Sequence, residues 1–132
     1  MLEIARREDK KGVYQKEIAG NQNISFKYLD HIIAGLKSAG LIMNVRGKKS
    51  GYALTRPPED ISILDIVEAF EPQICIVECV SDLVHCEAED TCATKLLWEG
   101  LNDQIVQYLK NYSLGKLVQD QNALLKKNEN LH

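Results

Sequence analysis

Three cysteines, Cys79, Cys86 and Cys92, lie within the fourteen residues CVSDLVHCEAEDTC, together with one histidine and four carboxylates. Thiolates, imidazole and carboxylates bind iron and zinc, and exposed thiolates also react with oxidants. The first residues, MLEIARREDKK, lack the apolar segment of a secretory signal, so we expect a cytosolic, reducing environment in which disulfides are rare. The loop is therefore expected to be a metal site or a redox-active site.

Three kinds of chemistry compete for this loop. Iron-sulfur clusters are normally held by four thiolates, and one of these can be replaced by histidine or a carboxylate. The candidate fourth ligands are Cys75, His85, Glu87, Glu89, Asp90 or a group from a partner subunit. Zinc sites usually contain C-x2-4-C pairs, which the loop lacks. A thiol switch needs a stabilised thiolate, and the acidic surroundings argue against a low pKa; Cys75, in the apolar run QICIVECV, is expected to be buried and inert.

The charge is divided unequally along the chain. Residues 1–56 hold eleven Lys/Arg and five Asp/Glu, a net charge of +6, whereas residues 57–132 hold five and fourteen, a net charge of −9. A basic half suits a polyanion such as nucleic acid, because its phosphates attract Lys and Arg. A solvated charged surface without a partner is the alternative.

The basic half predicts two helices joined by a tight turn. A short helix is expected over 15–19, followed by a turn over 20–23. A second helix is expected from Ser25, a suitable N-cap, to Ala39, before Gly40. Its apolar stripe consists of Leu29, Ile32, Ile33 and Leu36. This is the helix-turn-helix pattern, whose second helix enters the DNA major groove. The candidate DNA-contacting residues on this helix are Ser25, Lys27, Tyr28 and His31.

A basic hairpin is expected directly after this helix. Strands over 41–46 and 52–55 flank the turn 47–51, and the candidate DNA-contacting residues are Arg46, Lys48 and Lys49. Cations at the tip of such a wing contact the DNA backbone or the minor groove. The predicted fold class is therefore mainly α with a small β-hairpin wing, that is, a winged helix-turn-helix.

The acidic half predicts two further helices and a tail. Ser62 and Asp65 form a capping box for the first helix, whose apolar residues are Ile63, Ile66, Val67 and Phe70, and Pro72 ends it. A long helix over 94–112 has a wide apolar face, formed by Leu96, Leu97, Trp98, Leu101, Ile105, Tyr108, Leu109 and Tyr112. A second copy of the chain is the expected partner of that face, and packing on its own domain is the alternative. One apolar turn over 114–118 precedes a polar tail, 119–132, expected to be frayed or disordered.

The segments KEIA, ISFKYLDHIIAGLKSAGLI and VRGKKSGYALTRPPEDISILDIVEAFE, followed by the cysteine loop and ATKLLWEGLND, resemble the IscR/NsrR/CymR (Rrf-two) family of bacterial transcription regulators. The resemblance covers about residues 13–118. It implies a cytoplasmic, dimeric winged-helix repressor or activator that binds pseudo-palindromic double-stranded DNA, with a cysteine-metabolism enzyme as a possible further partner. It also implies an iron-sulfur cluster, 2Fe-2S or 4Fe-4S, held by Cys79, Cys86 and Cys92, and a wing arginine at Arg46.

The sequence departs from the family pattern at three places. Family members usually start with a longer first helix, so the first helix is expected to be truncated here. Lys95 stands where some members have a ligating histidine, three residues after the last cysteine. The wing sequence GKKSGY has fewer glycines than the wing of many members, so different groove contacts are expected.

The predicted domain organisation is a DNA-binding region, 1–56, a sensor and dimerisation region, 57–118, and the polar tail. The predicted function is DNA-binding regulation of transcription in response to redox, iron or nitric oxide status. A cluster-free regulator that uses a thiol switch or a partner protein, and a winged-helix interaction module that does not bind DNA, are the alternatives. An enzyme is not expected, because thioredoxin, phosphate-loop and metalloprotease motifs are all missing.

Overall fold

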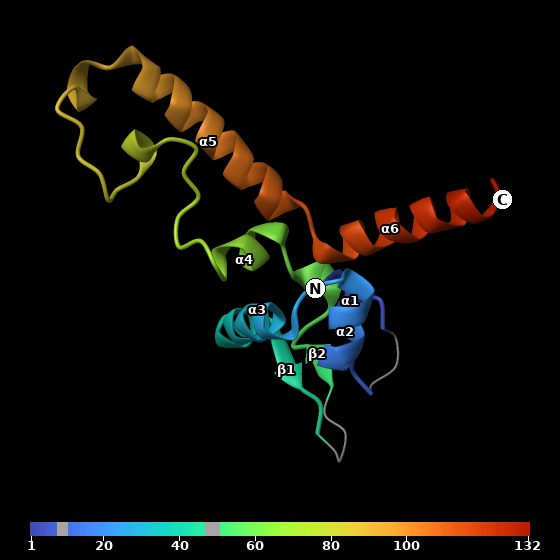
Figure 1. Ribbon diagram of the computed structural model, residues 1–132. Helices are drawn as coiled ribbons and strands as arrows, with labels where there is room; N and C mark the ends of the chain where they lie inside the picture. The colour runs from blue at the N-terminus through green and yellow to red at the C-terminus, as the bar shows by residue number, and fades with distance from the viewer. Residues whose placement is uncertain (8–10, 47–50) are drawn as a thin grey trace.

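The computed structural model describes residues 1–7, 11–46 and 51–132. Figure 1 shows an N-terminal body from which α5 leads away to the cysteine loop, while α6 projects in another direction. The helices are α1 (Leu2–Ala5), α2 (Gln15–Gln22), α3 (Phe26–Ser38), α4 (Ile63–Glu68), α5 (Ala93–Asn111) and α6 (Leu114–Glu129). The strands are β1 (Ile42–Asn44) and β2 (Tyr52–Leu54), and the 3-10 turns are η1 (Pro58–Asp60), η2 (Glu78–Val80) and η3 (Glu89–Thr91). The predicted fold class, mainly α with a hairpin, is confirmed.

Helix α3 begins and ends where the sequence predicts. The Ser25 hydroxyl accepts a hydrogen bond from the Tyr28 N–H at 3.1 Å, and Gly40 takes a φ of 71° just beyond the helix. Helix α2 is longer than predicted, because the expected turn at Gly20 is still helical. Of the four residues predicted to form the turn, only Asn23 leaves the helix, with φ 50° and ψ 47°. Asparagine adopts this left-handed conformation more readily than most residues.

The hairpin is shorter than predicted and pairs with a third segment. Strands β1 and β2 are antiparallel, and Met43 is paired with Ala53. Tyr52 also exchanges two backbone hydrogen bonds of 2.9 Å with Val13. A Cβ atom at Gly51 would lie 2.9 Å from the Gly12 carbonyl carbon, so glycine is what allows these backbones to approach. The predicted wing-tip residues Lys48 and Lys49 lie outside the described residues.

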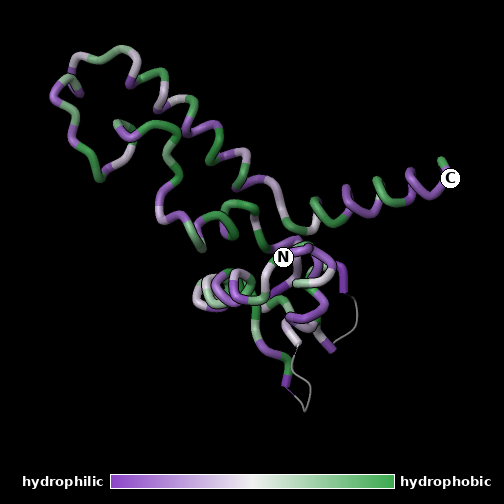
Figure 2. Tube along the Cα trace, viewed as in Figure 1, coloured by the Kyte–Doolittle hydropathy of each residue, from purple (hydrophilic) through white to green (hydrophobic). Residues whose placement is uncertain are grey.

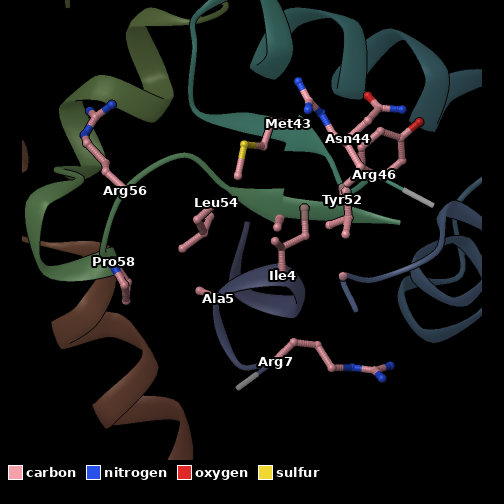
Figure 3. Close-up of a pocket in the computed structure, with 13 residues that line it drawn as sticks. Ile4, Ala5, Arg7, Met43, Asn44, Arg46, Tyr52, Leu54, Arg56 and Pro58 are labelled. Carbon is pink, nitrogen blue, oxygen red and sulfur yellow. The ribbon is translucent and has the colours of Figure 1, made fainter. Parts of the chain in front are cut away.

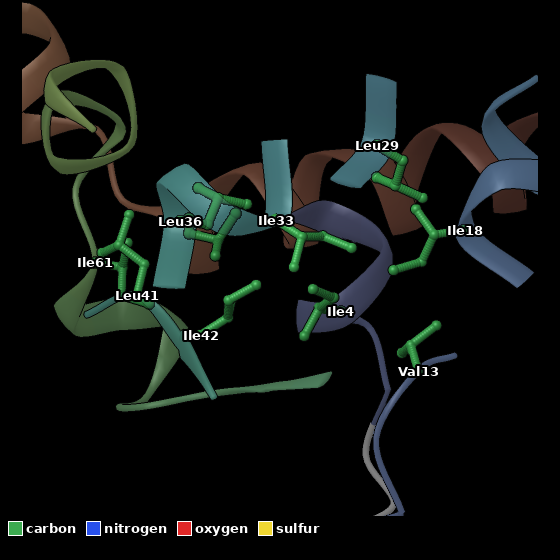
Figure 4. Packing of buried hydrophobic residues seen from close by; sticks show 10 residues of the cluster. Ile4, Val13, Ile18, Leu29, Ile33, Leu36, Leu41, Ile42 and Ile61 are labelled. Atoms are coloured by element: carbon green, nitrogen blue, oxygen red, sulfur yellow. The ribbon is translucent and has the colours of Figure 1, made fainter. Parts of the chain in front are cut away.

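The hydrophobic core joins α3 to every other part of the body. Figure 4 shows Leu29 and Ile33 of α3 facing Ile18 of α2 and Ile4 of α1. The buried cluster consists of Ile4, Val13, Ile18, Leu29, Ile33, Leu36, Leu41, Ile42, Ile61 and Leu114. Each such side chain contributes about 1.5–3 kcal/mol on burial. The core therefore fixes the orientation of α3 relative to the hairpin.

Helix α4 has the predicted capping box but a different buried residue. Ser62 Oγ accepts from the Asp65 N–H, and Asp65 accepts from the Ser62 N–H, each at 3.0 Å. Leu64 is the buried side chain of this helix, whereas Phe70, one of the apolar residues named from the sequence, is 42% exposed. The tertiary contacts select Leu64, because the ring of Phe70 lies beside Gly35 of α3 at the edge of the body.

The junction between α5 and α6 is attached to the start of α4. The Ile63 N–H donates to the Tyr112 carbonyl at 2.8 Å, and the Leu114 N–H donates to the Ile61 carbonyl at 2.7 Å. The Leu114 side chain is fully buried in the core. The junction is therefore part of the N-terminal body and not a free linker.

Helix α5 agrees with its prediction to within one residue at each end. Its apolar face is open to solvent in the single chain: Leu97 is 62% exposed and Tyr108 is 66% exposed. Figure 2 shows hydrophobic positions recurring along α5. Among the helices of the described residues, none combines the length and apolar character needed to span a membrane.

The predicted frayed tail is wrong, because α6 continues to Glu129. Ser113 caps the helix by accepting from the Lys116 N–H at 3.0 Å. The Lys116 ammonium and the Tyr112 hydroxyl both donate to the Asp120 carboxylate, which adds support in the first turns. The sequence prediction weighed the polar composition of this segment and overlooked its helix formers, Ala, Leu, Lys and Gln.

Candidate nucleic-acid interface and cysteine loop

The predicted DNA-contacting residues of α3 lie on its exposed side. Lys27, Tyr28 and His31 are all exposed, and Tyr28 is 60% exposed. Ser25 is exposed as well, although its hydroxyl is used to cap the helix. The buried stripe of α3 faces the other way, into the core. The structure therefore brings these four residues together at the N-terminal half of one helix.

Arg46 lies just beyond β1 and is exposed, as the wing prediction requires. Sequence analysis missed Phe26, the first residue of α3, which is 53% exposed beside the cap. An exposed aromatic ring at the start of a recognition helix can contact base edges or methyl groups. The sequence feature that could have indicated Phe26 is its position directly after the N-cap residue Ser25.

A pocket of about 560 Å³ lies beneath the hairpin, between β2, α1 and the segment at Pro58. In Figure 3, Ile4, Leu54 and Met43 surround its middle, and the guanidinium groups of Arg7 and Arg56 lie at its outside. Arg7 pairs with Glu17 at 2.9 Å and Arg56 pairs with Asp65 at 3.2 Å. The two arginines therefore contribute mainly their aliphatic stems to the pocket.

The cysteine loop connects α4 to the far end of α5. Cys79, Cys86 and Cys92 are half-buried free thiols, and so is Cys75. Within residues 1–7, 11–46 and 51–132, no three side chains of His, Cys, Asp or Glu come together in a group that could hold a metal ion. The structure therefore places the predicted ligands on one loop but does not gather them into a ligand set.

Cys92 is the N-cap of α5, and its environment corrects an expectation from the sequence. Its Sγ lies 3.0 Å from the Thr94 hydroxyl oxygen. The Thr94 hydroxyl, followed by the Lys95 backbone N–H, lowers the pKa of the Cys92 thiol. The expectation that acidic neighbours prevent a low pKa is therefore wrong at Cys92, because groups at the helix N-terminus outweigh them.

Lys95, three residues after Cys92, is held by two carboxylates. Its ammonium group donates to Glu89 and lies 3.6 Å from Glu99, and its side chain is only 14% exposed. The hydrogen bond from Lys95 lowers the pKa of the Glu89 carboxyl, and Glu89 in turn raises the pKa of Lys95. His85 Nδ1 lies 3.4 Å from the other Glu89 oxygen. These side chains tie the loop to the first turns of α5.

Asn102 is the second residue that sequence analysis missed. It is a buried polar side chain of α5, bonded to the backbone of Ile74 and Ile76 at the start of the loop. An asparagine within an apolar helical pattern was the available signal, but its partners are distant in sequence. Asn102 therefore fixes the start of the loop against α5.

The comparisons with known proteins identify the family. The model of the Rrf2 family, described as an iron-dependent transcriptional regulator, matches residues 1–120. The chain belongs to the Rrf2 family. The HTH-type transcriptional regulator IscR of Escherichia coli is 31% identical over 124 residues, which cover 94% of this chain and 76% of that protein.

Two solved structures also resemble the structure of this chain. One is T. potens IscR, with a TM-score of 0.71 and 29% identity, covering 91% of this chain and 78% of that one. The other is CymR, the global cysteine regulator of B. subtilis, with a TM-score of 0.73 and 29% identity, covering 89% and 86%. The predicted family resemblance is confirmed. This Rrf2 chain is accordingly a transcriptional regulator of the DNA-binding kind and not an enzyme.

The types of donor on the cysteine loop suit an iron-sulfur cluster, although their side chains are not gathered into a ligand set within the described residues. Three free thiols on one loop supply soft sulfur ligands, and the histidine and carboxylates beside them are acceptable replacements for a fourth thiolate. Cys79, Cys86 and Cys92 are the residues that would hold the cluster. The spacing still lacks the close cysteine pairs typical of structural zinc sites.

Proposed function

We propose that this Rrf2 protein is a homodimeric regulator in the bacterial cytoplasm that binds pseudo-palindromic DNA and senses redox, iron or nitric oxide status through an iron-sulfur cluster, 2Fe-2S or 4Fe-4S. The observation that carries the proposal is the open N-terminal half of α3 beside the wing, in a chain that belongs to a family of transcriptional regulators. In this proposal Ser25, Lys27, Tyr28, His31 and Arg46 contact DNA. Lys48 and Lys49, which lie outside the described residues, remain predicted contacts at the wing tip.

Dimerisation through α5 is supported by its exposed apolar face. Leu97, Leu101 and Tyr108 lie on one side of the helix and remain 62%, 44% and 66% exposed. Burying such a face in a second copy is favourable because each apolar side chain leaves water. A two-fold dimer also presents two α3 helices to the two halves of a palindromic site.

Cluster binding is supported by the three thiols and by the attachment of their loop. A bound cluster supplies a group that gains or loses electrons and iron in response to conditions. Asn102 and the Lys95 ion pairs connect the loop to α5, and the α5–α6 junction connects α5 to the DNA-binding body. A change at the loop can therefore reach α3 through packed elements.

The DNA proposal is tested by selecting binding sites from random double-stranded oligonucleotides and measuring fluorescence anisotropy over a range of salt concentrations. Lys27→Ala should weaken binding and reduce the salt slope by about one, because one phosphate contact is lost. Lys110→Ala, an exposed lysine on α5, is the matched control and should leave the slope unchanged. An unchanged slope in Lys27→Ala, or failure to select any sequence, would contradict the proposal.

The cluster proposal is tested by anaerobic purification, visible absorbance and iron analysis. The wild-type protein should be coloured and contain iron, and Cys86→Ala should lose both. A colourless, iron-free wild type would refute the cluster.

A thiol switch without a cluster is the second candidate, and the lowered pKa of Cys92 favours it. In that case the iron-free protein should still change its DNA affinity after mild oxidation, and Cys92→Ser should abolish the change. A cysteine-metabolism enzyme as a partner stays a prediction.

A further inference from the structure

Phe26, the first residue of α3, is a large apolar side chain that the fold leaves on the surface. It lies three residues before Leu29 and seven before Ile33, so helical spacing places it on the same side of α3 as these two core residues. Leu29 and Ile33 are 3% and 6% exposed, whereas Phe26 is 53% exposed. Among the described residues, neither the buried cluster nor the partly buried hydrophobic side chains packed against it include Phe26. The apolar stripe of α3 therefore continues by one ring beyond the part of the helix that the body covers.

Polar and basic groups surround this ring. Ser25, directly before it, is the N-cap, and Lys27, directly after it, is exposed. His31, little more than one turn further along, is exposed as well. Residues 1–56 carry a net charge of +6, and the N-terminus of a helix adds a partial positive charge. This setting attracts a polyanion, so the charge around the ring favours nucleic acid as its partner.

The position of the ring in the helix decides which part of DNA it would meet. In a helix-turn-helix the second helix lies in the major groove, and its N-terminal residues contact base edges. Helical side chains are tilted toward the N-terminus, so the first residue of α3 is directed to that end. Aromatic wedges that separate base pairs enter from the minor groove instead. The ring of Phe26 would therefore meet the major-groove edges of the bases.

The chemistry of the base edges then selects the partner of the ring. Major-groove edges carry hydrogen-bond donors and acceptors and one apolar group, the C5-methyl group of thymine. Phenylalanine has neither a donor nor an acceptor, so covering a polar edge would remove water without replacing its hydrogen bonds. Covering the methyl group has no such cost. A methyl contact also distinguishes A·T from T·A, which the minor groove does not allow.

We propose that Phe26 reads thymine, and that its ring contacts the C5-methyl group of one thymine in each half-site. This inference rests on the DNA binding of the proposed function and adds a base-reading residue to the contacts assigned there. Lys27 binds phosphate and fixes the register of the helix, whereas Phe26 selects a base. The binding site is therefore expected to contain thymine at the same position of both halves.

The test replaces thymine by deoxyuridine, which lacks only the C5-methyl group. Binding sites are first selected for the full chain from random duplexes. Each thymine of the half-site is then replaced at the same position in both halves, one position at a time. Fluorescence anisotropy at fixed salt should show about 15-fold weaker binding for at least one position, because two methyl contacts of about fourfold each are lost.

Variants of the chain assign this effect to the ring. Phe26→Ala should bind the thymine and uracil sites equally at that position, and Phe26→Leu, which keeps an apolar side chain, should retain part of the discrimination. Lys27→Ala should weaken binding to both sites and keep their ratio, because a phosphate contact carries no sequence information. Leu131→Ala, an exposed apolar residue near the C-terminus, is the matched control and should change neither affinity.

Two kinds of result would overturn the inference. One is a wild-type protein that binds its selected site but is insensitive to uracil at every thymine, or that selects half-sites without thymine. The other is a thymine-to-uracil ratio that is the same in Phe26→Ala and wild type, which would assign the methyl contact to another residue. The first result needs no variant, so it does not depend on the folding of Phe26→Ala. Failure to select any DNA overturns the proposed function as well, whereas DNA binding without uracil sensitivity overturns this inference alone.

Discussion

Asn102 of α5 accepts a hydrogen bond from the Ile76 N–H at 3.1 Å, across a sequence separation of 26 residues. The same amide donates to the Ile74 carbonyl at 2.9 Å, and the side chain is only 7% exposed. One side chain thus satisfies two backbone groups for which the described residues offer no other hydrogen-bond partner. The start of the cysteine loop is therefore attached to the middle of α5 by a directional contact.

Replacing Asn102 should release the start of the loop. Asn102→Ala leaves the Ile74 carbonyl and the Ile76 N–H unpaired and should cost about 1–3 kcal/mol of unfolding free energy. Hydrogen exchange of the Ile76 amide should become faster, as measured by mass spectrometry or NMR. Asn111→Ala, at the exposed end of the same helix, is the control and should change neither quantity. Equal exchange rates in wild type and Asn102→Ala would show that the contact does not hold the loop.

Gly35 should be sensitive to substitution where Gly20 is not. A Cβ atom at Gly35 would lie 2.5 Å from the Phe70 ring, whereas nothing lies within 4 Å of one at Gly20. Gly20→Ala should therefore gain about 0.5–1 kcal/mol from helix propensity. Gly35→Ala should lose stability, because the ring must move. Chemical denaturation measures both changes. Adding Phe70→Ala should make Gly35→Ala favourable; an additive double mutant would contradict the contact.

Tyr112 should titrate at higher pH than an ordinary tyrosine. Its hydroxyl donates to the Asp120 carboxylate, and this raises the pKa of Tyr112. A pKa raised in the folded state means stability that is present below the unfolded value of about 10 and is lost as pH rises through the folded pKa. Tyrosinate absorbance, taken as the difference between wild type and Tyr112→Phe, measures the pKa. Asp120→Asn should lower it; no difference would exclude the hydrogen bond as the cause.

The same group, Tyr112, Lys116 and Asp120, also predicts how stability changes at acid pH. The Lys116 ammonium, followed by the Tyr112 hydroxyl, lowers the pKa of Asp120. Its stabilising contribution is thus present above the unfolded value of about 3.9 and is lost as pH falls through the lower folded pKa. The difference in thermal stability between wild type and Asp120→Asn, measured by circular dichroism, should therefore shrink as pH falls through this range. Lys116→Met should reduce the difference at neutral pH, and a difference independent of pH would rule out this ionisation.

Cys92 should be the most reactive thiol of the reduced, metal-free protein near neutral pH. Its lowered pKa means a larger thiolate fraction, and the Thr94 hydroxyl is the largest cause. Alkylation by iodoacetamide, resolved by peptide mass spectrometry, should label Cys92 before Cys79 and Cys86. Thr94→Val should slow the labelling of Cys92 alone. Uniform rates at the cysteines, or no effect of Thr94→Val, would argue against a special thiolate.

The apolar face of α5 should control assembly. Leu97→Glu places a charge in the proposed interface and should convert the dimer to a monomer in analytical ultracentrifugation. Lys110→Glu introduces the same residue on the opposite side of the helix and should leave the dimer intact. A monomeric wild type, or a dimeric Leu97→Glu variant, would place the partner of this face elsewhere.

Local signals explain what the sequence predicted well. Ser25 and Ser62 cap their helices through contacts three residues away, and the long helix has a strong apolar period, so neighbouring residues define these elements. The exposed side of α3 likewise follows from the spacing of the apolar residues in that helix. The candidate DNA-contacting residues of α3 could therefore be placed before the structure was known.

Features that depend on distant contacts were missed. Leu64, which was not among the apolar residues named from the sequence, is the buried residue of α4. Asn102 pairs with a segment 26 residues away. Leu114 anchors α6 in a core that the rest of the chain builds. The pKa of Cys92 depends on the helix that starts beside it, and composition alone indicated the wrong sign. Each of these required knowledge of which elements meet.

The anchored junction between α5 and α6 makes α5 a lever with one fixed end. Ser62 and Ser113 form an antiparallel bridge that holds this end to the DNA-binding body, and the other end carries Cys92. Nineteen residues at 1.5 Å each give an arm of about 28 Å, so a displacement of about 2.5 Å at the cysteine end corresponds to a rotation of only about 5° at the junction. A small displacement of the loop therefore corresponds to a rotation of only a few degrees at the end that is attached to the body. In the proposed function, sensing through this arm therefore requires a DNA complex whose affinity depends steeply on the angle between its two halves.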